Sequence, residues 1–437
     1  MRPRFYALFA VPAILGGALG SGVSDCDSLR LAACPTPVDK RLPAAREMLS
    51  WQGEDRVVGL RNTWRLYPGD VFRTGGGTPS PLPRDDRPLT DIHYRFSGEL
   101  RDLAAYRTHQ RLAGLLLLKN GRIALEYYGL GNTELTLWTS RSVGKSVVST
   151  LIGIAIREGK IRSVDDPIVR YLPELERTAW DGVTLRQLIT HTSGIAWNEK
   201  YDDPKSDFSA LTECEAAADS YPCIMRLISS RPRREAVAPG EVWSYNTGGA
   251  WLVGRLLEQA TGMPIARYLE TRVWRREPME RDGVWQALLP GKIDMGGHGF
   301  NATLRDWGRF ALFVERGGRL EDGTQLLPDG WLQEATTWTR ARGSVTPETP
   351  DGQYGFQWWY NPGESVAGDP DGVRAVARDS FWALGIYGQA IAIDRVAHVV
   401  MVQWSAWPAA SPEDGTANEM PAFFAAAVHA LDRESTH

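Results

Sequence analysis

A serine and a lysine three residues apart give this 437-residue chain its clearest capacity for chemistry. Ser142 and Lys145 stand in the run Trp138-Thr-Ser-Arg-Ser-Val-Gly-Lys-Ser146. At this spacing the two side chains lie on one face of a helix, so the amine reaches the hydroxyl. A nucleophilic serine that lacks a histidine needs such a base. Lysine is also scarce, because only seven of the 49 basic residues are Lys.

The residues after this pair predict a buried helix. It ends near Gly159, before a charged stretch that comes too soon for a membrane span, and its apolar positions cover most sides: Val143, Val147, Val148, Leu151, Ile152, Ile154, Ala155 and Ile156. Ser142 then opens a core helix, where backbone N–H groups favour negative charge. Burial lowers the pKa of a lysine, so Lys145 can serve as a neutral base.

Two other interpretations compete for the same residues. Gly144-Lys145-Ser146 resembles the end of a phosphate-binding loop, but that motif needs a glycine where Thr139 stands. Ser142 alone is equally well explained as a helix N-cap. The spacing by itself does not decide between catalysis and capping.

Composition bounds the function. Hydrophobic content of 43% and charged content of 23% are typical of a globular protein, and the length allows one large domain or two to three ordinary ones. A net charge of −4 gives no support for nucleic-acid binding or for a stable membrane partner. No His/Cys cluster has metal-ligand spacing, so we expect neither a metal nor a cofactor.

The N-terminus resembles a secretory signal over residues 1–20. A positive start is followed by the apolar stretch 5–19 and by small residues at 18–20. We therefore expect a periplasmic or secreted protein, with an uncleaved anchor as the lesser alternative. A lipoprotein-like Leu31-Ala-Ala-Cys34 is set apart from the apolar stretch by polar residues, which argues against lipidation.

Export makes the four cysteines informative. Cys26 lies close to Cys34 in sequence, and Cys214 lies close to Cys223. An oxidising compartment favours two local disulfides, although four cysteines allow three pairings and four free thiols remain the alternative.

The chain divides into a Pro/Gly/Arg-rich N-terminal extension, 21–90, and a main domain, 91–433, with a helical insertion at about 160–345. The patterns predict helices at 98–110, 251–261, 304–315 and 420–431, and strands at 114–118, 122–128, 374–384, 388–393 and 398–404. This is an α+β fold, an antiparallel sheet flanked by helices with an inserted all-helical subdomain.

From about residue 100 to 432 the chain resembles the serine β-lactamase/penicillin-binding-protein-like superfamily. Within it, the sequence is most similar to class C-related esterases and to the nylon-oligomer (6-aminohexanoate-dimer) hydrolases. Six ordered stretches carry the resemblance: Ser142-Val-Gly-Lys145, Val164–Ile168 with Tyr171–Glu174, Leu185–Gly194, Pro239–Gly248, Tyr354–Trp359 and Gly385–Gln389. It implies a β-lactamase/transpeptidase-like fold.

The resemblance also implies roles. Ser142 would be the acylated nucleophile, Lys145 its proton acceptor, and Tyr245 the second member of the base pair. The oxyanion would sit between the backbone N–H groups of Ser142 and Ile386.

Two departures narrow the substrate. Thr247 stands where the family often has an asparagine, and the family's Lys-Thr-Gly is replaced by Ala383-Leu-Gly385 or Ile386-Tyr-Gly388. Without that lysine the site lacks a cation for the carboxylate of a β-lactam or cell-wall peptide.

Further candidates for substrate contact are Tyr201, Thr247, Gly385 and Tyr387, whereas His191 is interpreted as structural and satisfied by backbone. We therefore expect a serine hydrolase acting on small esters or linear amides. The alternatives are a β-lactamase or D,D-peptidase, and an inactive cell-wall-binding homologue.

Overall fold

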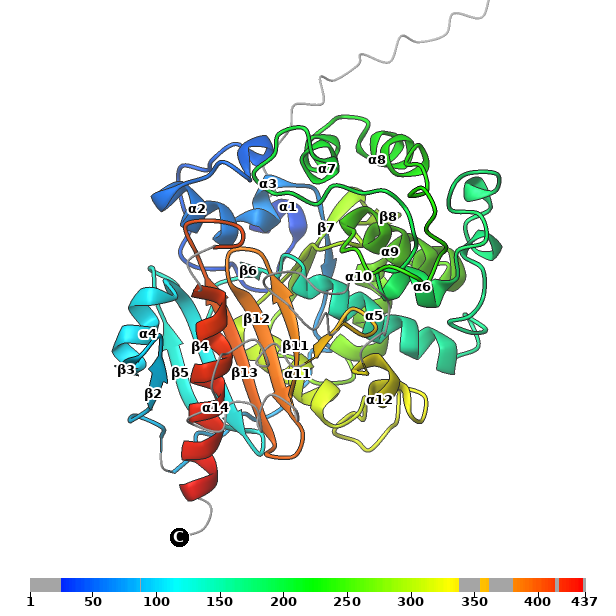
Figure 1. Ribbon diagram of the computed structural model, residues 1–437. Coiled ribbons are helices and arrows are strands. Elements are labelled where there is room, and N and C mark those ends of the chain that lie inside the picture. The colour runs from blue at the N-terminus through cyan, green and yellow to red at the C-terminus, as the bar shows by residue number, and fades with distance from the viewer. Residues whose placement is uncertain (1–24, 87, 338–353, 361–379, 413–415, 435–437) are drawn as a thin grey trace, which may run out of the picture.

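The main sheet joins strands from the two ends of the principal domain (Figure 1). The computed structural model describes residues 25–86, 88–337, 354–360, 380–412 and 416–434. In this part of the chain a six-stranded antiparallel sheet has the order β10-β11-β12-β13-β4-β5. Its strands are β4 (Leu112–Lys119), β5 (Arg122–Tyr128), β10 (Trp359–Tyr360), β11 (Ser380–Gly385), β12 (Gln389–Asp394) and β13 (Val399–Ser405).

Strand β4 is apolar from Leu112 to Leu118 because both of its faces are buried. Leu116 and Leu118 belong to the larger core, whereas Leu115 and Leu117 belong to a second core on the opposite face. Successive side chains point to opposite sides of a sheet, so a strand between two helical layers needs apolar residues at every position.

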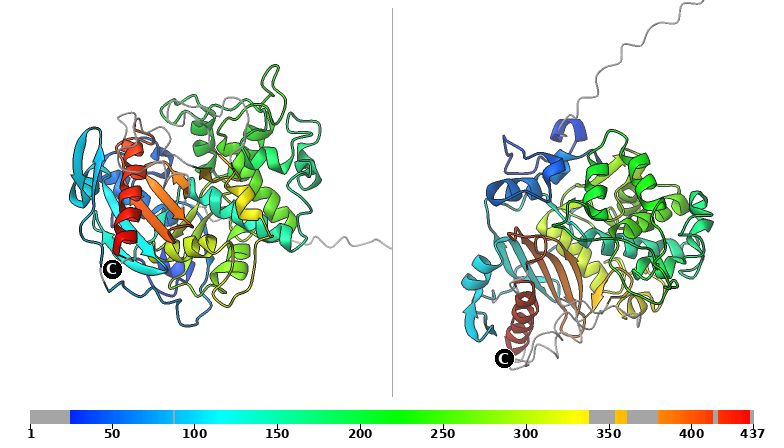
Figure 2. Two further views of the ribbon diagram at one scale, coloured as in Figure 1. Left: turned by 60° about the horizontal axis from the view of Figure 1, so that its bottom comes forward. Right: turned by 45° about the horizontal axis from the view of Figure 1, so that its top comes forward.

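Helices cover both faces (Figures 1 and 2). On one face lie α14 (Thr416–Glu434), α4 (Leu103–His109) and the hairpin of β2 (His93–Phe96) and β3 (Glu99–Asp102). On the other lie α5 (Val143–Arg157) and α11 (Leu304–Glu315). The predicted α+β arrangement, an antiparallel sheet flanked by helices, is confirmed.

A smaller sheet corrects the expected all-helical insertion. Its order is β1-β7-β9-β6, with β8 on β7, and its strands are β1 (Gly69–Phe72), β6 (Trp138–Thr139), β7 (Gly283–Leu289), β8 (Ile293–Asp294) and β9 (Phe300–Ala302). β7 pairs with β1, and β9 pairs with β6. The two strands of each of these pairs are far apart in sequence, so no local hairpin pattern predicts the pairings.

The rest of the segment from about 160 is helical, with α9 packed against α5. Besides α11, its α-helices are α6 (Leu185–Ile189), α7 (Asp207–Glu215), α8 (Ser220–Ser229), α9 (Thr247–Thr261), α10 (Ile265–Leu269) and α12 (Trp331–Ala335). Short 3₁₀ turns cover Ile168–Arg170 and Pro173–Leu175, and a π-helical turn covers Glu270–Trp274.

The N-terminal extension is built into the fold. Its helices are α1 (Cys26–Leu29), α2 (Gly53–Arg61) and α3 (Thr63–Leu66), with a 3₁₀ turn at Ala45–Glu47. Trp51, Leu60 and Phe72 lie in the larger core. The segment therefore supports the main domain instead of merely preceding it.

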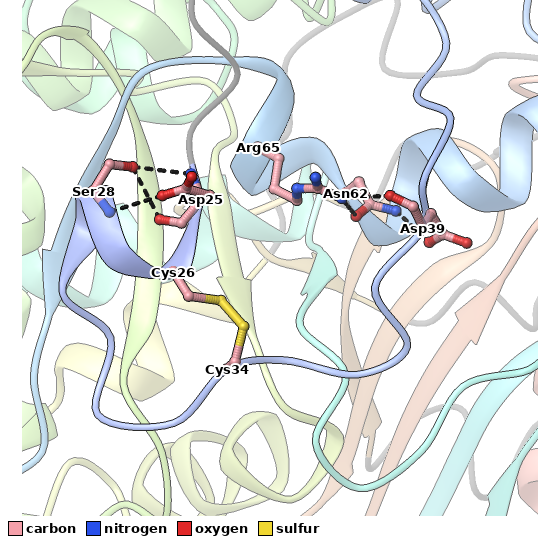
Figure 3. Close-up of a disulfide and its surroundings, with 7 residues drawn as sticks. All are labelled: Asp25, Cys26, Ser28, Cys34, Asp39, Asn62 and Arg65. Carbon is pink, nitrogen blue, oxygen red and sulfur yellow. Dashed lines mark hydrogen bonds between the residues drawn. A yellow bond between two sulfur atoms is a disulfide. The ribbon is translucent and has the colours of Figure 1, made fainter.

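Two local disulfides join Cys26 to Cys34 and Cys214 to Cys223, as the spacing predicted. Figure 3 shows the first at the start of the described chain. Beside it, Asn62 Nδ2 donates to Asp39 Oδ2 at 2.6 Å and Arg65 Nη1 donates to the Asp39 carbonyl at 2.9 Å. The disulfide and these bonds tie the irregular N-terminal segment to the α2–α3 region.

Most predicted elements are present. The helices expected at 251–261, 304–315 and 420–431 lie within α9, α11 and α14, and four of the five expected strands correspond to β4, β5, β12 and β13. The fifth matches β11 from residue 380 onward, and its residues 374–379, like the signal segment 1–20, lie outside the described residues. Among the described helices, none has the length and apolarity to cross a membrane.

The helix expected at 98–110 begins later. Ser97 and Gly98 have φ of 51° and 83° and form the turn of the β2–β3 hairpin. Asp102 then accepts from the Ala105 N–H at 2.7 Å as the N-cap of α4. The turn at Gly98 and strand β3 therefore occupy the five residues 98–102, which helical periodicity had assigned to the helix.

Two glycines of α9 provide a test of its packing. A Cβ on Gly254 would lie 2.4 Å from Gly296 Cα, whereas a Cβ on Gly249 would meet nothing closer than 3.4 Å. We expect Gly254→Ala to lower the free energy of unfolding by about 1–3 kcal/mol through backbone overpacking. The matched Gly249→Ala should leave it unchanged or raise it by up to about 1 kcal/mol, since alanine favours helix. Urea unfolding of both variants measures the difference, and equal effects would contradict the close approach.

Candidate active site

Ser142 and Lys145 are in direct contact at the start of α5. Ser142 is the N-cap residue, with φ −65° and ψ −9°, but its side chain makes no capping hydrogen bond. Lys145 Nζ instead donates to Ser142 Oγ at 2.8 Å. The hydroxyl therefore faces the amine and not the helix end, which is the geometry of a serine with an adjacent base.

The backbone before Ser142 is fixed by both sheets. In β6, the Trp138 indole donates to Gln389 Oε1 of β12 at 2.7 Å. One residue after β6, the Ser140 N–H donates to the Phe300 carbonyl of β9 at 2.7 Å. Arg141 then takes φ 45°, a left-handed conformation that is uncommon for a residue with a side chain. This turn presents Ser142 at the junction of the two sheets.

Lys145 is buried, with 1% of its surface exposed. Burial lowers the pKa of its ammonium to about 8, while the negative charges of Glu199 and Glu215 oppose that decrease. A large fraction of Lys145 is then neutral in mildly alkaline solution. A neutral amine bonded to a serine hydroxyl can accept its proton.

Tyr245 lies beside the amine. Its ring centre is 5.1 Å from Lys145 Nζ. Burial and the charge of Glu199 raise the pKa of Tyr245, so that it is a neutral phenol. It precedes α9, where Asn246 Oδ1 accepts from the Gly249 N–H at 2.7 Å as the N-cap. The structure thus brings Ser142, Lys145 and Tyr245 together.

An aromatic wall that the sequence did not identify holds Tyr245 in place. The Tyr245 ring stacks on Trp359 with centres 5.8 Å apart, and it also meets Trp243 and Tyr354. The only sequence signal was that these residues lie in the stretches 239–248 and 354–359 quoted for the family resemblance. Trp359 is half-buried, so part of this wall is accessible beside the reactive residues.

His191 is packed in that wall and not satisfied by backbone as expected. Its ring lies 4.5 Å from the Tyr245 ring and 4.9 Å from the Tyr354 ring, between centres. Neither ring nitrogen has a hydrogen-bond partner among the described residues. Burial and the charge of Lys145 keep the pKa of His191 well below its usual range, so that it remains neutral. The structural interpretation stands, but through aromatic packing.

The end of β11 closes the site opposite α5. A Cβ on Gly385 would lie 2.7 Å from the Ser140 carbonyl and 3.1 Å from the Ser142 nitrogen. Only a residue without a side chain permits this approach. Ile386 follows directly and is 9% exposed. The strand thereby runs up to the backbone amide of Ser142.

Tyr387 is not placed to contact a substrate. Its side chain is 1% exposed, and its hydroxyl donates to the Met48 carbonyl at 3.2 Å. The Arg56 guanidinium lies over its ring at 4.7 Å. With φ 65°, the left-handed backbone turns this side chain toward the N-terminal segment. Tyr387, which the sequence analysis named as a candidate substrate contact, is instead a buried residue bonded to the N-terminal segment.

Tyr201 and Thr247 meet at Glu199, a half-buried residue that the sequence analysis missed. Thr247 donates to the Glu199 carboxylate through its N–H at 3.0 Å and through its hydroxyl. Tyr201 is half-buried against Phe208, and its hydroxyl donates to Glu199 at 3.4 Å. A single glutamate in a polar loop carries no sequence signal of such contacts. Among the described residues, no group of three or more His, Cys, Asp or Glu side chains could hold a metal.

The fold and this geometry agree with a family comparison. The Beta-lactamase family matches residues 101–420. The chain belongs to the β-lactamase family. It is a serine hydrolase of the β-lactamase fold, and the resemblance stated from its motifs is confirmed.

Three relatives show the range of this family. The chain is 26% identical to the 6-aminohexanoate-dimer hydrolase of Paenarthrobacter ureafaciens over 311 residues, covering 67% of this chain and 72% of that protein. It is 27% identical to the β-lactamase of Escherichia coli K12 over 196 residues, covering 41% and 48%. A solved structure named "Putative 6-aminohexanoate-dimer hydrolase from Bacillus anthracis" has a TM-score of 0.74 at 20% identity, covering 91% of this chain and 99% of that one.

The structural role of buried Tyr387 in this β-lactamase-family protein can be tested. We expect Tyr387→Phe to lower the free energy of unfolding by about 1 kcal/mol, because the hydroxyl loses its bond to the Met48 carbonyl. Its kcat/KM on an activated ester should stay within about twofold of wild type, since truncating a hydroxyl that touches no substrate leaves the transition state unchanged. A tenfold loss of kcat/KM in the folded variant would indicate that Tyr387 contacts the substrate after all.

Proposed function

We propose that this protein is an exported hydrolase that cleaves carboxylic esters or linear amides through an acyl-enzyme on Ser142. The observation that carries the proposal is the 2.8 Å hydrogen bond from Lys145 Nζ to a serine hydroxyl that makes no capping bond. The N-terminal signal pattern and the two disulfides support export.

In the proposed acylation, Ser142 Oγ attacks the substrate carbonyl carbon and passes its proton to Lys145. The backbone N–H groups of Ser142 and Ile386 stabilise the tetrahedral oxyanion. Collapse of the intermediate expels the alcohol or amine, which takes up the proton through Tyr245. A water molecule then attacks the acyl-enzyme with the same groups acting as base, and free carboxylic acid is released.

The residues beside Ser142 favour uncharged, open-chain substrates. Strand β11 carries no basic residue between Ser380 and Gly385, and Ile386 follows it. A carboxylate next to the scissile bond would therefore find no lysine on this strand. The relative matched over most of its length is named for a linear amide, the 6-aminohexanoate dimer. Half-buried Trp359 adds an apolar surface for the acyl or leaving group.

Replacement of the nucleophile tests the proposal. We expect Ser142→Ala to reduce kcat on p-nitrophenyl esters by about 10³-fold or more, because no covalent intermediate can form. The substrate panel should include anilides, a linear amide and a chromogenic cephalosporin. Faster turnover of the cephalosporin than of any ester or amide would favour the β-lactamase alternative. A folded wild-type protein that is not labelled by a fluorophosphonate would indicate an inactive homologue.

The pH dependence follows from Lys145. The neutral amine is the active form, and its pKa is about 8, so kcat/KM should rise with pH and level off above this value. His191 cannot supply this limb, because burial holds its pKa well below the usual range of a histidine. The pH profile of ester hydrolysis, measured with a non-ionising substrate, provides the check. A profile that is flat from about pH 6 to about pH 9 would contradict a lysine base.

A further inference from the structure

We propose that His191 is a positioning residue for Tyr245, and that its ring holds the phenol where it can pass a proton to the leaving group. The proposal rests on the function proposed above for Ser142, Lys145 and Tyr245. It gives a part in the reaction to a residue that the sequence analysis interpreted as structural.

Among the rings that contact Tyr245 in the described part of the chain, that of His191 is the nearest. The two ring centres are 4.5 Å apart, whereas the centres of the other three rings of the wall lie 5.8 to 6.3 Å from Tyr245. Lys145 Nζ lies 5.1 Å from the same phenol ring centre. The imidazole and the amine therefore pack on one ring, so the place of His191 bears on the distance between Tyr245 and Lys145.

The main chain joins the two residues a second time. The Ser244 N–H, one residue before Tyr245, donates to the His191 carbonyl at 2.8 Å. One residue after Tyr245, Asn246 Oδ1 accepts from the Gly249 N–H at 2.7 Å. The backbone of Tyr245 is thus fixed on both sides, which leaves the rotation of its side chain to the rings that pack on it.

His191 lies in a turn after α6 that is itself held firmly. Its φ of 55° is left-handed, a conformation that histidine and asparagine adopt more often than most residues with a side chain. Thr190 Oγ1 and Thr192 Oγ1 are hydrogen-bonded at 2.9 Å within the turn, and the Gly240 N–H donates to the Thr192 carbonyl at 2.7 Å. A fixed turn therefore presents the imidazole to Tyr245.

The imidazole acts on Tyr245 by contact and not by hydrogen bonding. Both of its nitrogens are buried, and neither has a hydrogen-bond partner among the described residues. Such nitrogens cost free energy, so packing alone would favour a phenyl ring at this position. A variant that keeps a ring at position 191 should therefore keep the effect on Tyr245, and a variant without a ring should lose it.

The leaving group of the substrate reports on the place of Tyr245. In the proposed acylation Ser142 Oγ bonds to the carbonyl carbon, the bond from that carbon to the leaving oxygen breaks, and this oxygen receives a proton through Tyr245. A p-nitrophenolate leaves as a stable anion, whereas an ethoxide needs the proton. A displaced phenol therefore slows an ethyl ester more than the p-nitrophenyl ester of the same acid, and a general loss of structure slows both equally.

The test compares kcat/KM of the full chain on these two esters. We expect His191→Asn, which suits the left-handed backbone and removes the ring, to lower kcat/KM about tenfold or more on the ethyl ester and at most about threefold on the p-nitrophenyl ester. His191→Phe keeps a ring and should stay within about threefold of wild type on both. Thr190→Val removes a hydrogen bond from the same turn and should leave the ratio of the two values unchanged.

A double variant shows whether His191 acts through Tyr245. Tyr245→Phe lowers kcat/KM on the ethyl ester by itself, and adding His191→Asn should then change that value by less than about twofold. Equal losses on both esters, or a full further loss in the Tyr245→Phe background, would overturn this inference alone.

Folding of the variants is checked by circular dichroism. His191→Leu, which keeps an apolar side chain without a ring, replaces His191→Asn if the latter does not fold. Failure of both variants to fold would show a purely structural residue and would also overturn the inference. A Tyr245→Phe protein with wild-type values on both esters would instead refute the proposed role of Tyr245, and this inference with it.

Discussion

The site depends on one costly arrangement, an amine buried against a serine hydroxyl. Lys145 is almost fully covered, and a buried ammonium without partners is strongly unfavourable. Two effects reduce the cost of burying this ammonium. Burial lowers the pKa of Lys145 to about 8, so part of it is neutral, and the negative charges of Glu199 and Glu215 favour the charged form. The result is an amine that is partly neutral and is held by a hydrogen bond to Ser142 Oγ.

Three distant segments must meet for this arrangement to exist. The β6–α5 turn presents Ser142, the end of β11 approaches its backbone amide, and the start of α9 brings Tyr245. The large sheet fixes β11, and the small sheet fixes β6 through β9. The two sheets are joined at the site itself, where the Trp138 indole donates to Gln389. The N-terminal extension contributes β1 and so belongs to this support.

Much of the fold could be predicted because its elements carry strong local patterns. The apolar run of β4, the periodicity of α11 and the Asn120-Gly121 turn each depend on residues close in sequence. The small sheet could not be predicted in this way. All of its strands except β7 have four residues or fewer, and β7 pairs with a strand more than 200 residues earlier, at Gly69–Phe72. Only the folded chain provides the partner that turns such a segment into a strand.

The sequence by itself determined the reactive pair, because Ser142 and Lys145 are neighbours on one helical turn and need no other element to meet. The quoted motifs also identified Tyr245 as their partner. Tertiary structure alone decided which negative charges act on the amine, namely those of Glu199 and Glu215. It also decided that the Tyr387 hydroxyl bonds to the Met48 carbonyl. The physical reason is that burial and charge act through space, so the charge of a glutamate in a polar loop acts on Lys145 only when folding brings that loop to the start of α9.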